Sequence, residues 1–322
     1  MKAYRVHEIG QNPRFENVEI PTPRSGEILI RIIACGLNFA DLLMVNGQYQ
    51  DTPETPFSPG LELSGIVEAL GPNTDGPAIG TRVAIFGGQG GLAEYGVFPT
   101  DRAVVIPDSM SFETAAGFQI AYGTSHLALQ HRANLQKNET LVVLGAAGGV
   151  GLTAVEIGKL MGAKVIACAR GSDKLEVARA AGADHVLDSE RDDLRDEIKR
   201  LGGADVVYDP VGGDSFIQVF RACNPDARIL SIGFASGNVP EIKLNHMLVK
   251  NITVIGFYWG GYLKFSPKTL TGSMAQLMAW HADGKLSPAI NQIFDFDKSD
   301  DALQLMRERK STGKIVVRVS AI

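Results

Sequence analysis

A run of small residues behind a short apolar strand constrains this chain most. Residues 140–144 are apolar or β-branched, and residues 145–151 read Gly-Ala-Ala-Gly-Gly-Val-Gly before apolar residues at helical spacing. Glycines between a strand and a helix form the loop that holds a dinucleotide pyrophosphate at a helix N-terminus. Gly148 would let the backbone approach the phosphate, and Gly151 would let the helix pack on the strand. We therefore expect a dinucleotide site at Ala147, Gly148, Gly149, Val150 and Gly151.

The loop departs from the usual G-x-G-x-x-G pattern, because Ala146 stands in place of the first glycine. A glycine-rich turn in an ordinary α/β domain is therefore an alternative. The segments that follow favour the dinucleotide site, since strands and helices alternate. Further strands are expected at 164–169, 185–187, 204–208, 227–232 and 251–255, with helices at 173–181, 192–201, 213–222 and 244–249. This alternation predicts an α/β fold with a six-stranded, doubly wound parallel sheet, the Rossmann fold.

The end of the second strand indicates which dinucleotide is bound. An NAD site usually has Asp or Glu there for the ribose 2′-hydroxyl, but this chain has Ala169. Arg170, Ser172 and Lys174 follow and would bind a 2′-phosphate. We interpret Asp173 as the N-cap of the next helix. The pattern favours NADPH as cofactor; in the alternative, both cations are solvent-exposed residues at a helix start.

Three residues follow the fifth and sixth strands of this segment. Gly233 and Phe234 come after the strand at 227–232, and Phe257 comes after the strand at 251–255. Ligands of open α/β sheets bind at the carboxyl ends of the strands, so we expect these residues near the nicotinamide end of the cofactor. Ordinary packing is the alternative for each of them.

A chain of 322 residues is longer than one average domain, and the Rossmann segment, 123–262, lies in its middle. We expect the flanks, 1–122 and 263–322, to form a second domain together. The first flank has short β-like runs at 1–7, 27–34, 63–70, 82–86 and 93–97, which suggest a compact β-barrel. The second has a helix through 276–281, a strand at 289–296, a helix at 299–309 and a strand at 314–319. That last strand should return to the first domain.

Charge and apolar patterning exclude several classes of partner. A formal net charge of −5 without a basic stripe gives no reason to expect nucleic acid or an anionic membrane. The start of the chain lacks the apolar region of a signal peptide, and no apolar run is long enough to span a bilayer, so we expect a cytoplasmic protein. Cys35, Cys168 and Cys223 are far apart in sequence, and we interpret them as small buried residues.

Several motifs carry a resemblance across nearly the whole chain. They are Gly-Leu-Asn-Phe-Ala-Asp at 36–41, Pro-Gly-Leu-Glu-Leu-Ser-Gly at 59–65, the glycine loop, Val-Tyr-Asp-Pro-Val-Gly-Gly at 207–213 and Gly-Lys-Ile-Val at 313–316. With these the chain resembles the medium-chain dehydrogenase/reductases, in particular the zinc-independent quinone oxidoreductase (zeta-crystallin-like) branch. The resemblance implies a GroES-like catalytic domain built from both flanks. It also implies a homodimer, for which the apolar segment 251–257 is a candidate contact.

The resemblance also bears on metal content. In zinc-dependent relatives the catalytic ligands would stand at Asn38, Leu61 and Ala116, and none of these residues is a zinc ligand here. The cysteine-rich lobe of those relatives is reduced to residues 86–91. Without a Lewis acid an alcohol is not readily ionised at neutral pH. The expected reaction is therefore hydride delivery to an electron-poor small molecule, a quinone or an α,β-unsaturated carbonyl.

By the same resemblance Asn38, Asp41 and Tyr49 are the candidate catalytic residues, and Thr124 lies near the cofactor. Asn38 could instead cap the helix that begins near Phe39, and Asp41 could order that turn. The Thr124 hydroxyl could instead form hydrogen bonds with backbone groups. Three functions stay open: NADPH-dependent quinone reduction, reduction of enoyl thioesters or other enones, and NADPH binding without catalysis.

Overall fold

The computed structural model describes residues 1–321, so Ile322 of the expected second flank lies outside it. These residues form two compact units, which are described separately. The first comprises Met1–Ile120 and the segment from Pro288 onward, and the second comprises Ala121–Ser287. The chain therefore leaves and re-enters the first unit, as expected, but the second division lies at 287/288 and not at 262/263.

The shifted division has a physical cause. Residues 263–287 contain helix α10 (Pro267–Ala282), which we expected in the first domain. It packs instead against the second unit, because Ser273 Oγ lies 2.7 Å from His126 Nδ1 and the ring of Trp280 meets the His126 ring edge-on. Sequence patterning predicts a helix here but gives no information about which unit it packs on.

The second unit is built on a parallel sheet in the order β10-β9-β8-β11-β12-β13. All six expected strands are present: β8 (Thr140–Leu144), β9 (Lys164–Ala169), β10 (His185–Asp188), β11 (Ala204–Asp209), β12 (Cys223–Ser231) and β13 (Thr253–Gly256). The order reverses between β8 and β11, which is the switch point where doubly wound folds bind their ligands. The α/β fold class is confirmed.

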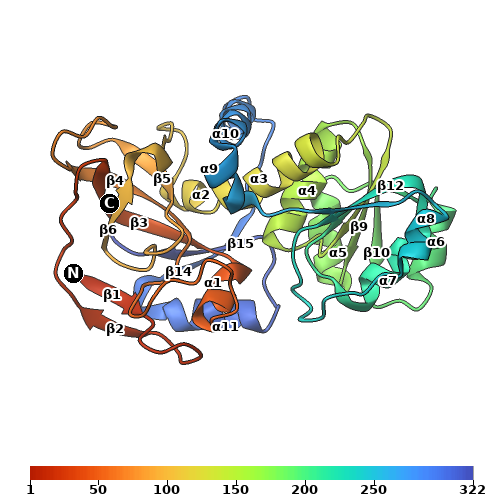
Figure 1. Ribbon diagram of the computed structural model, residues 1–322, viewed down its shortest axis with the longest axis horizontal. Coiled ribbons are helices and arrows are strands. Elements are labelled where there is room, and N and C mark those ends of the chain that lie inside the picture. The colour runs from red at the N-terminus through yellow and green to blue at the C-terminus, as the bar shows by residue number, and fades with distance from the viewer. Residues whose placement is uncertain (322) are drawn as a thin grey trace. The chain divides into compact units, whose positions relative to one another are not determined.

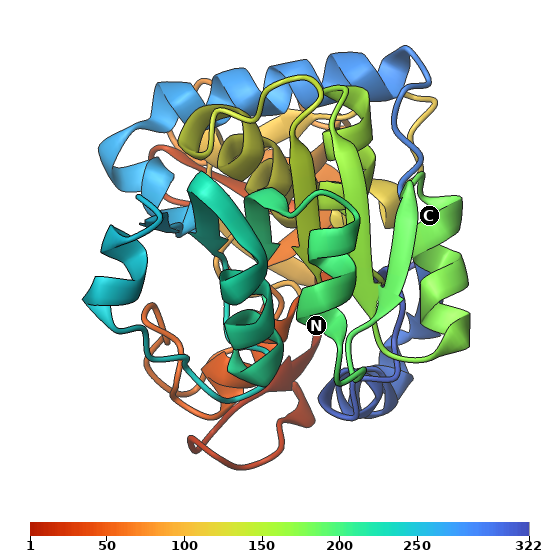
Figure 2. The same ribbon diagram turned by 90° about the vertical axis from the view of Figure 1, so that its right-hand side faces the viewer.

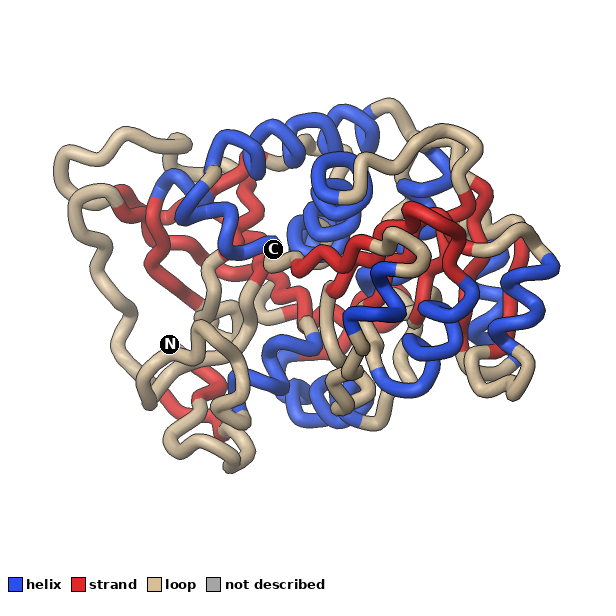
Figure 3. The backbone as a smooth tube through the Cα atoms, turned by 45° about the vertical axis from the view of Figure 1, so that its right-hand side comes forward, coloured by secondary structure: helices blue, strands red, loops and turns tan. Residues whose placement is uncertain are grey.

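Helices alternate with these strands (Figure 3) and lie on both sides of the sheet (Figure 2). They are α4 (Gly149–Leu160), α5 (Ser172–Ala180), α6 (Leu194–Arg200), α7 (Gly213–Ala222), α8 (Leu244–Leu248) and α9 (Tyr262–Phe265), with a π-helical η2 (Leu127–Arg132) and a 3-10 turn η3 (Trp259–Gly261). Helix α3 (Gln119–His126) contains the division between the units. Because the sheet is covered on both faces, its central strands are buried along their length, as in β8.

The first unit contains a seven-stranded sheet in the order β14-β15-β3-β4-β5-β7, with β6 added to β3. Its strands are β3 (Glu27–Leu37), β4 (Glu62–Leu70), β5 (Arg82–Phe86), β6 (Tyr95–Pro99), β7 (Ala103–Val105), β14 (Ile290–Asp295) and β15 (Lys314–Arg318), beside a separate pair β1 (Lys2–Arg5) and β2 (Arg14–Asn17). Helices α1 (Phe39–Val45), α2 (Phe112–Ala116) and α11 (Ser299–Arg307) and the 3-10 turns η1 (Thr100–Arg102) and η4 (Phe296–Lys298) complete it.

The last strand returns to this first unit as expected. Strand β15 pairs antiparallel with β3 (Figure 1). In this register Ile315 faces Leu37 and Val317 faces Cys35. These strands share one core with β4 and α11, in which Ile30, Leu63 and Leu303 are buried. The pairing also places Lys314, the first residue of β15, close to the end of β3 where the Asn38 motif begins.

Candidate functional site

The glycine loop between β8 and α4 has the geometry of a phosphate-binding turn. Gly145 takes a positive φ of 59°, its carbonyl accepts a hydrogen bond of 2.9 Å from Gly148 N, and Ala146 N donates to Cys168 O at 3.0 Å. The tight turn therefore depends on Gly145, one residue before the alanine that replaces the motif's first glycine. The sequence signal for this turn is the glycine that directly follows the apolar run at 140–144.

The space around Gly151 agrees with its expected packing role, while the approach of a phosphate to Gly148 stays a prediction. A Cβ on Gly151 would lie 2.1 Å from Gly145 O, so only glycine lets α4 pack this close to the turn. A Cβ on Gly148 would meet nothing nearer than Gly145 O at 3.4 Å. Gly148 is the N-cap of α4 and has no side chain to occupy the first-turn N–H groups, which leaves them suited to an anion.

Buried hydroxyl groups fix α4 to its neighbours. Ser125 Oγ donates to Val150 O at 3.0 Å and lies 2.8 Å from Thr153 Oγ1 and 3.0 Å from the Tyr208 hydroxyl. The start of α4 is thus tied to α3 and to β11. Thr124 precedes Ser125 on α3 and is 7% exposed. Its contact with a cofactor stays a prediction.

The end of β9 carries the expected cations, together with carboxylates that we did not expect. Arg170 Nε pairs with Glu190 Oε1 at 2.7 Å, and Gly171 N donates to Asp188 Oδ2 at 3.2 Å. The pKa of Lys174 is lowered by burial and, to a lesser extent, by the positive charge of Arg170. Asp188 and Glu190 follow β10, and only the pairing of β9 with β10 brings them here.

The expected N-cap at Asp173 is wrong. Helix α5 begins at Ser172 and its N-cap is Gly171, which takes a positive φ of 78°. Asp173 lies in the first turn, where its carboxylate accepts a hydrogen bond of 3.1 Å from Ser172 Oγ. The Ser172 hydroxyl is therefore engaged locally. A glycine N-cap leaves the first-turn N–H groups of α5 without a capping side chain.

Gly233, Phe234 and Phe257 lie at the same carboxyl edge of the sheet. Gly233 N donates to Asp209 O at 3.3 Å, and Phe257 N donates to Ser231 O at 3.1 Å. Phe234 is 41% exposed, whereas Phe257 is 8% exposed with its ring 5.8 Å from that of Tyr262. Packing thus accounts for the Phe257 ring, while the Phe234 ring is available to a ligand.

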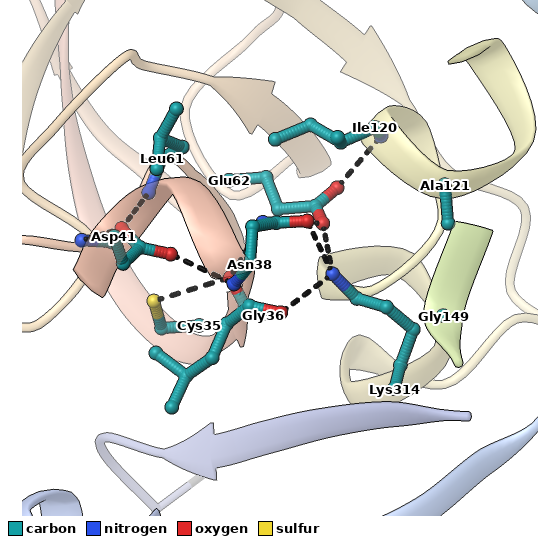
Figure 4. Close-up of polar contacts among 12 residues, drawn as sticks. Cys35, Gly36, Asn38, Asp41, Leu61, Glu62, Ile120, Ala121, Gly149 and Lys314 are labelled. Atoms are coloured by element: carbon teal, nitrogen blue, oxygen red, sulfur yellow. Dashed lines mark hydrogen bonds and ion pairs between the residues drawn. The ribbon is translucent and has the colours of Figure 1, made fainter. Parts of the chain in front are cut away.

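In the first unit, Asn38 belongs to a polar network at the end of β3 (Figure 4). It is the N-cap residue of α1, but its side chain turns toward two charged residues. Asn38 Nδ2 donates to Glu62 Oε1 at 3.1 Å and to Gly36 O at 3.3 Å, and Asn38 Oδ1 accepts from Lys314 Nζ at 2.7 Å. Asn38 and Asp41 have the arrangement of a capping box, but Asp41 N donates to the Asn38 carbonyl at 2.9 Å, and the hydrogen bonds of the Asn38 side chain go to Lys314, Glu62 and Gly36 O.

Asp41 is buried, and its carboxylate binds backbone N–H groups of two segments. Its carboxylate accepts hydrogen bonds from Asn38 N (2.8 Å), Gly60 N (2.8 Å) and Leu61 N (3.1 Å). Burial raises the pKa of Asp41 to about 7, against the lowering effect of the hydrogen bonds from Asn38 and Gly60. The residue joins the start of α1 to the 59–65 motif, which agrees with the ordering role that we gave as its alternative.

Tyr49 lies in the loop after α1 and is partly exposed. Its carbonyl accepts hydrogen bonds from Thr52 N at 3.1 Å and Thr52 Oγ1 at 2.7 Å, which closes a local turn. The backbone position of Tyr49 is thus fixed by neighbours in sequence. The catalytic role of its hydroxyl stays a prediction.

Glu62 and Lys314 are site residues that sequence reasoning missed, although both stand inside quoted motifs. The signal was a charged residue next to an apolar strand run, Leu-Glu-Leu at 61–63 and Lys-Ile-Val-Val at 314–317. Their side chains are 1% and 7% exposed and form an ion pair of 2.7 Å. Burial of this kind is rare for charged residues unless they are paired.

Residues 1–321 contain neither a metal-binding cluster nor a helix that could span a membrane. No group of three or more His, Cys, Asp or Glu side chains within 1–321 is arranged to hold a metal ion. No helix in that range is long and apolar enough to cross a membrane.

Comparison with known families gives two matches. Residues 24–108 match the alcohol dehydrogenase GroES-like domain, and residues 149–280 match the zinc-binding dehydrogenase family. The first match lies in the first unit and the second in the Rossmann unit. Together they support the expected pairing of a GroES-like domain with a dinucleotide-binding domain.

Individual relatives agree with these matches. The chain is 39% identical to a quinone oxidoreductase-like protein 2 homolog of Nematostella vectensis, over 98% of this chain and 89% of the relative. Solved structures of the quinone oxidoreductases of Thermus thermophilus (30% identity, TM-score 0.88, 99% and 100% coverage) and Escherichia coli (25%, 0.91, 99% and 100%) include NADPH complexes. The chain therefore belongs to the medium-chain dehydrogenase/reductase family, in its quinone oxidoreductase branch.

Proposed function

We propose that this protein is an NADPH-dependent, zinc-independent oxidoreductase that reduces quinones. The observation that carries the proposal is the sheet edge where β8 and β9 end side by side, because the Gly145–Gly151 turn follows β8 while Arg170 and Lys174 follow β9. A ligand with a pyrophosphate and a 2′-phosphate fits that pairing. The NADPH complexes of the two structural relatives support it.

Different residues at this edge would bind different parts of the cofactor. The first-turn N–H groups of α4 would hold the pyrophosphate, while Arg170, Ser172 and Lys174 would hold the 2′-phosphate. Thr124, Gly233, Phe234 and Phe257 would surround the nicotinamide end. When bound, NADPH supplies a hydride to the acceptor.

In our proposal Asn38 and Tyr49 serve the acceptor, and Asp41 positions the Asn38 backbone through its 2.8 Å hydrogen bond. Zinc independence is proposed from residue chemistry. Positions 38, 61 and 116 offer an amide, an isobutyl group and a methyl group, and Lys314 places an ammonium against the Asn38 oxygen. An ammonium repels a second cation, so this position is unsuited to a metal ion.

Reduction of an α,β-unsaturated carbonyl is the second candidate function. Substitution of Tyr49 distinguishes it from quinone reduction. An enone oxygen gains charge as hydride arrives, so a hydroxyl donor beside it should lower the barrier. Quinones are easier to reduce and can take protons from water afterwards. Tyr49→Phe should therefore reduce kcat/KM for enones more than for quinones, with Tyr95→Phe on β6 as the matched control.

The test follows NADPH absorbance with benzoquinone, naphthoquinone, acrolein and crotonyl-CoA, with and without a chelator. We expect turnover of the quinones that the chelator leaves unchanged. Turnover of only the enones would favour the second candidate, and NADPH binding without any turnover would indicate a binding protein. Loss of activity with chelator together with one zinc per chain would contradict zinc independence.

We also propose a homodimer, for which β13 is the candidate contact. This strand ends the order of its sheet, and nearby Leu244, Leu248 and Val249 are each more than 70% exposed. An open strand edge next to exposed apolar side chains suits pairing with a second copy. The cytoplasmic location stays a prediction.

A further inference from the structure

The ion pair of Lys314 and Glu62 forms the centre of a hydrogen-bond network without spare donors. Lys314 Nζ donates to Leu37 O at 2.8 Å, Asn38 Oδ1 at 2.7 Å and Glu62 Oε1 at 2.7 Å, which uses all three of its N–H groups. Glu62 Oε2 accepts from Ile120 N at 2.9 Å. Figure 4 shows three of these hydrogen bonds meeting at Lys314 Nζ, with the Asn38 and Glu62 side chains beside it.

This network determines which way the Asn38 amide faces. An ammonium can only donate, so the oxygen of the amide must face Lys314. A carboxylate and a carbonyl can only accept, so the nitrogen must face Glu62 and Gly36. Rotation of the amide by half a turn would set donor against donor and acceptor against acceptor at these contacts.

Both amide hydrogens of Asn38 are therefore in use, and one lone pair of Oδ1 is left. We infer that Lys314, together with Glu62, is a positioning residue that locks Asn38 so that it offers a ligand only a hydrogen-bond acceptor. The group that it binds is then an N–H or O–H of cofactor or acceptor, and not the carbonyl oxygen that receives charge. This inference rests on the proposed function, because it concerns how Asn38 serves that site.

Substitution of Lys314 alone could lower activity either by releasing Asn38 or by destabilising the fold, and activity would not distinguish the two effects. Lys314→Met leaves the Glu62 carboxylate buried without its counter-charge, which is strongly destabilising in general. The double variant Lys314→Met/Glu62→Gln removes both charges, and its glutamine can donate or accept, so of the groups that direct the Asn38 amide only the Gly36 carbonyl, at 3.3 Å, remains. The matched control is Lys159→Met/Asp184→Asn, which removes an ion pair of the same 2.7 Å length in the second unit.

The first measurement needs no cofactor. In the ¹⁵N-labelled chain the Asn38 side-chain amide signals are identified by their loss in Asn38→Ala. We expect two well-resolved, slowly exchanging proton signals in the wild type and in the control, and collapse of their separation with at least about tenfold faster exchange in Lys314→Met/Glu62→Gln, because local opening sets the exchange rate. Unchanged signals in that double variant would contradict the inference that Lys314 and Glu62 fix the Asn38 amide.

The second measurement is a mutant cycle with benzoquinone. We expect Lys314→Met/Glu62→Gln to lower kcat/KM at least about tenfold in the wild-type background. In the Asn38→Ala background the same double substitution should lower kcat/KM by less than about twofold, because it acts through Asn38. Wild-type kcat/KM in the double variant, or an equal loss in both backgrounds, would overturn the positioning role while leaving quinone reduction intact. If the wild type reduces no acceptor, the proposed function fails, and the amide signals alone decide the orientation.

Discussion

At the scale of single residues, the first unit places two carboxylates and one ammonium within one buried region. Asp41 accepts only backbone N–H groups, whereas Glu62 pairs with Lys314. Burial and the nearby negative charge of Glu62 raise the pKa of Asp41, while Lys314 lowers it. The negative charge of Asp41 is thus opposed by backbone hydrogen bonds and not by a direct ion pair. With a pKa of about 7, Asp41 should titrate near neutral pH.

Asp41→Asn tests this titration. The folded-state pKa of about 7 lies above the ordinary aspartate value of 3.8, so the native state holds the proton more tightly than the unfolded chain. The resulting stability is fully present below the unfolded pKa and is lost as pH rises through about 7. The wild-type free energy of unfolding, measured in urea relative to Asp41→Asn, should therefore fall between about pH 4 and about pH 8. A difference that stays constant with pH would contradict the raised pKa.

A second prediction at this scale concerns the phosphate site. Arg170→Ala and Lys174→Ala should each weaken NADPH, by about 1.5 kcal/mol given the exposure of Arg170, and leave NADH nearly unchanged. Glu190→Gln should tighten NADPH, since it releases Arg170 from its 2.7 Å ion pair. Fluorescence titration of both cofactors measures these dissociation constants. Equal losses for the two cofactors would mean that the side chains support the fold instead.

At the scale of elements, the turn from β8 into α4 has no room for a Cβ at Gly151. Helix α4 approaches the turn so closely that Gly151 has backbone where a Cβ would stand. Backbone atoms cannot rotate away as a side chain can, so the helix itself would have to move. Cofactor binding depends on the same first turn of α4.

Gly151→Ala should therefore destabilise the protein by about 1 to 3 kcal/mol and weaken NADPH and NADH alike. Gly272→Ala is the matched control, because Gly272 lies in α10 with nothing within 4 Å of its added Cβ. That variant should gain about 0.5 to 1 kcal/mol and keep both affinities. Thermal unfolding and cofactor titration measure the pair, and a Gly151→Ala protein with wild-type values would contradict the close packing.

At the scale of the whole molecule, one carboxylate holds both places where the chain leaves the second unit. Glu156 on α4 accepts a hydrogen bond from the Tyr122 hydroxyl at 2.5 Å and from Ser287 N at 2.6 Å. Tyr122 follows the first division between the units and Ser287 precedes the second. Helix α4 thus holds the two ends of the second unit's chain segment.

The proposed dimer is the other property at this scale. Thr253 is exposed on β13, so Thr253→Lys should place a charge in the proposed contact and yield monomers. His185→Lys on β10, the strand at the opposite end of the sheet, should leave the assembly unchanged. Sedimentation velocity measures both. A wild-type monomer, or a dimer that survives Thr253→Lys, would exclude this contact.

The sequence by itself determined the Rossmann sheet and its cofactor edge, because both depend on local patterns. Apolar strands alternating with helices and a glycine turn repeat over a few residues each, and all six strands of the second unit were predicted. The packing role of Gly151 followed from the same short spacing.

Only the tertiary structure decided which distant residues meet. Lys314 lies 252 positions from Glu62, and their pairing exists because β15 adds to β3. Glu190 reaches Arg170 through the pairing of β10 with β9, and α10 joins the second unit through His126. A helix or strand pattern indicates a buried face but not the partner that covers it. The orientation of the Asn38 amide is decided by such partners, since a donor-only and an acceptor-only group must stand on either side of it.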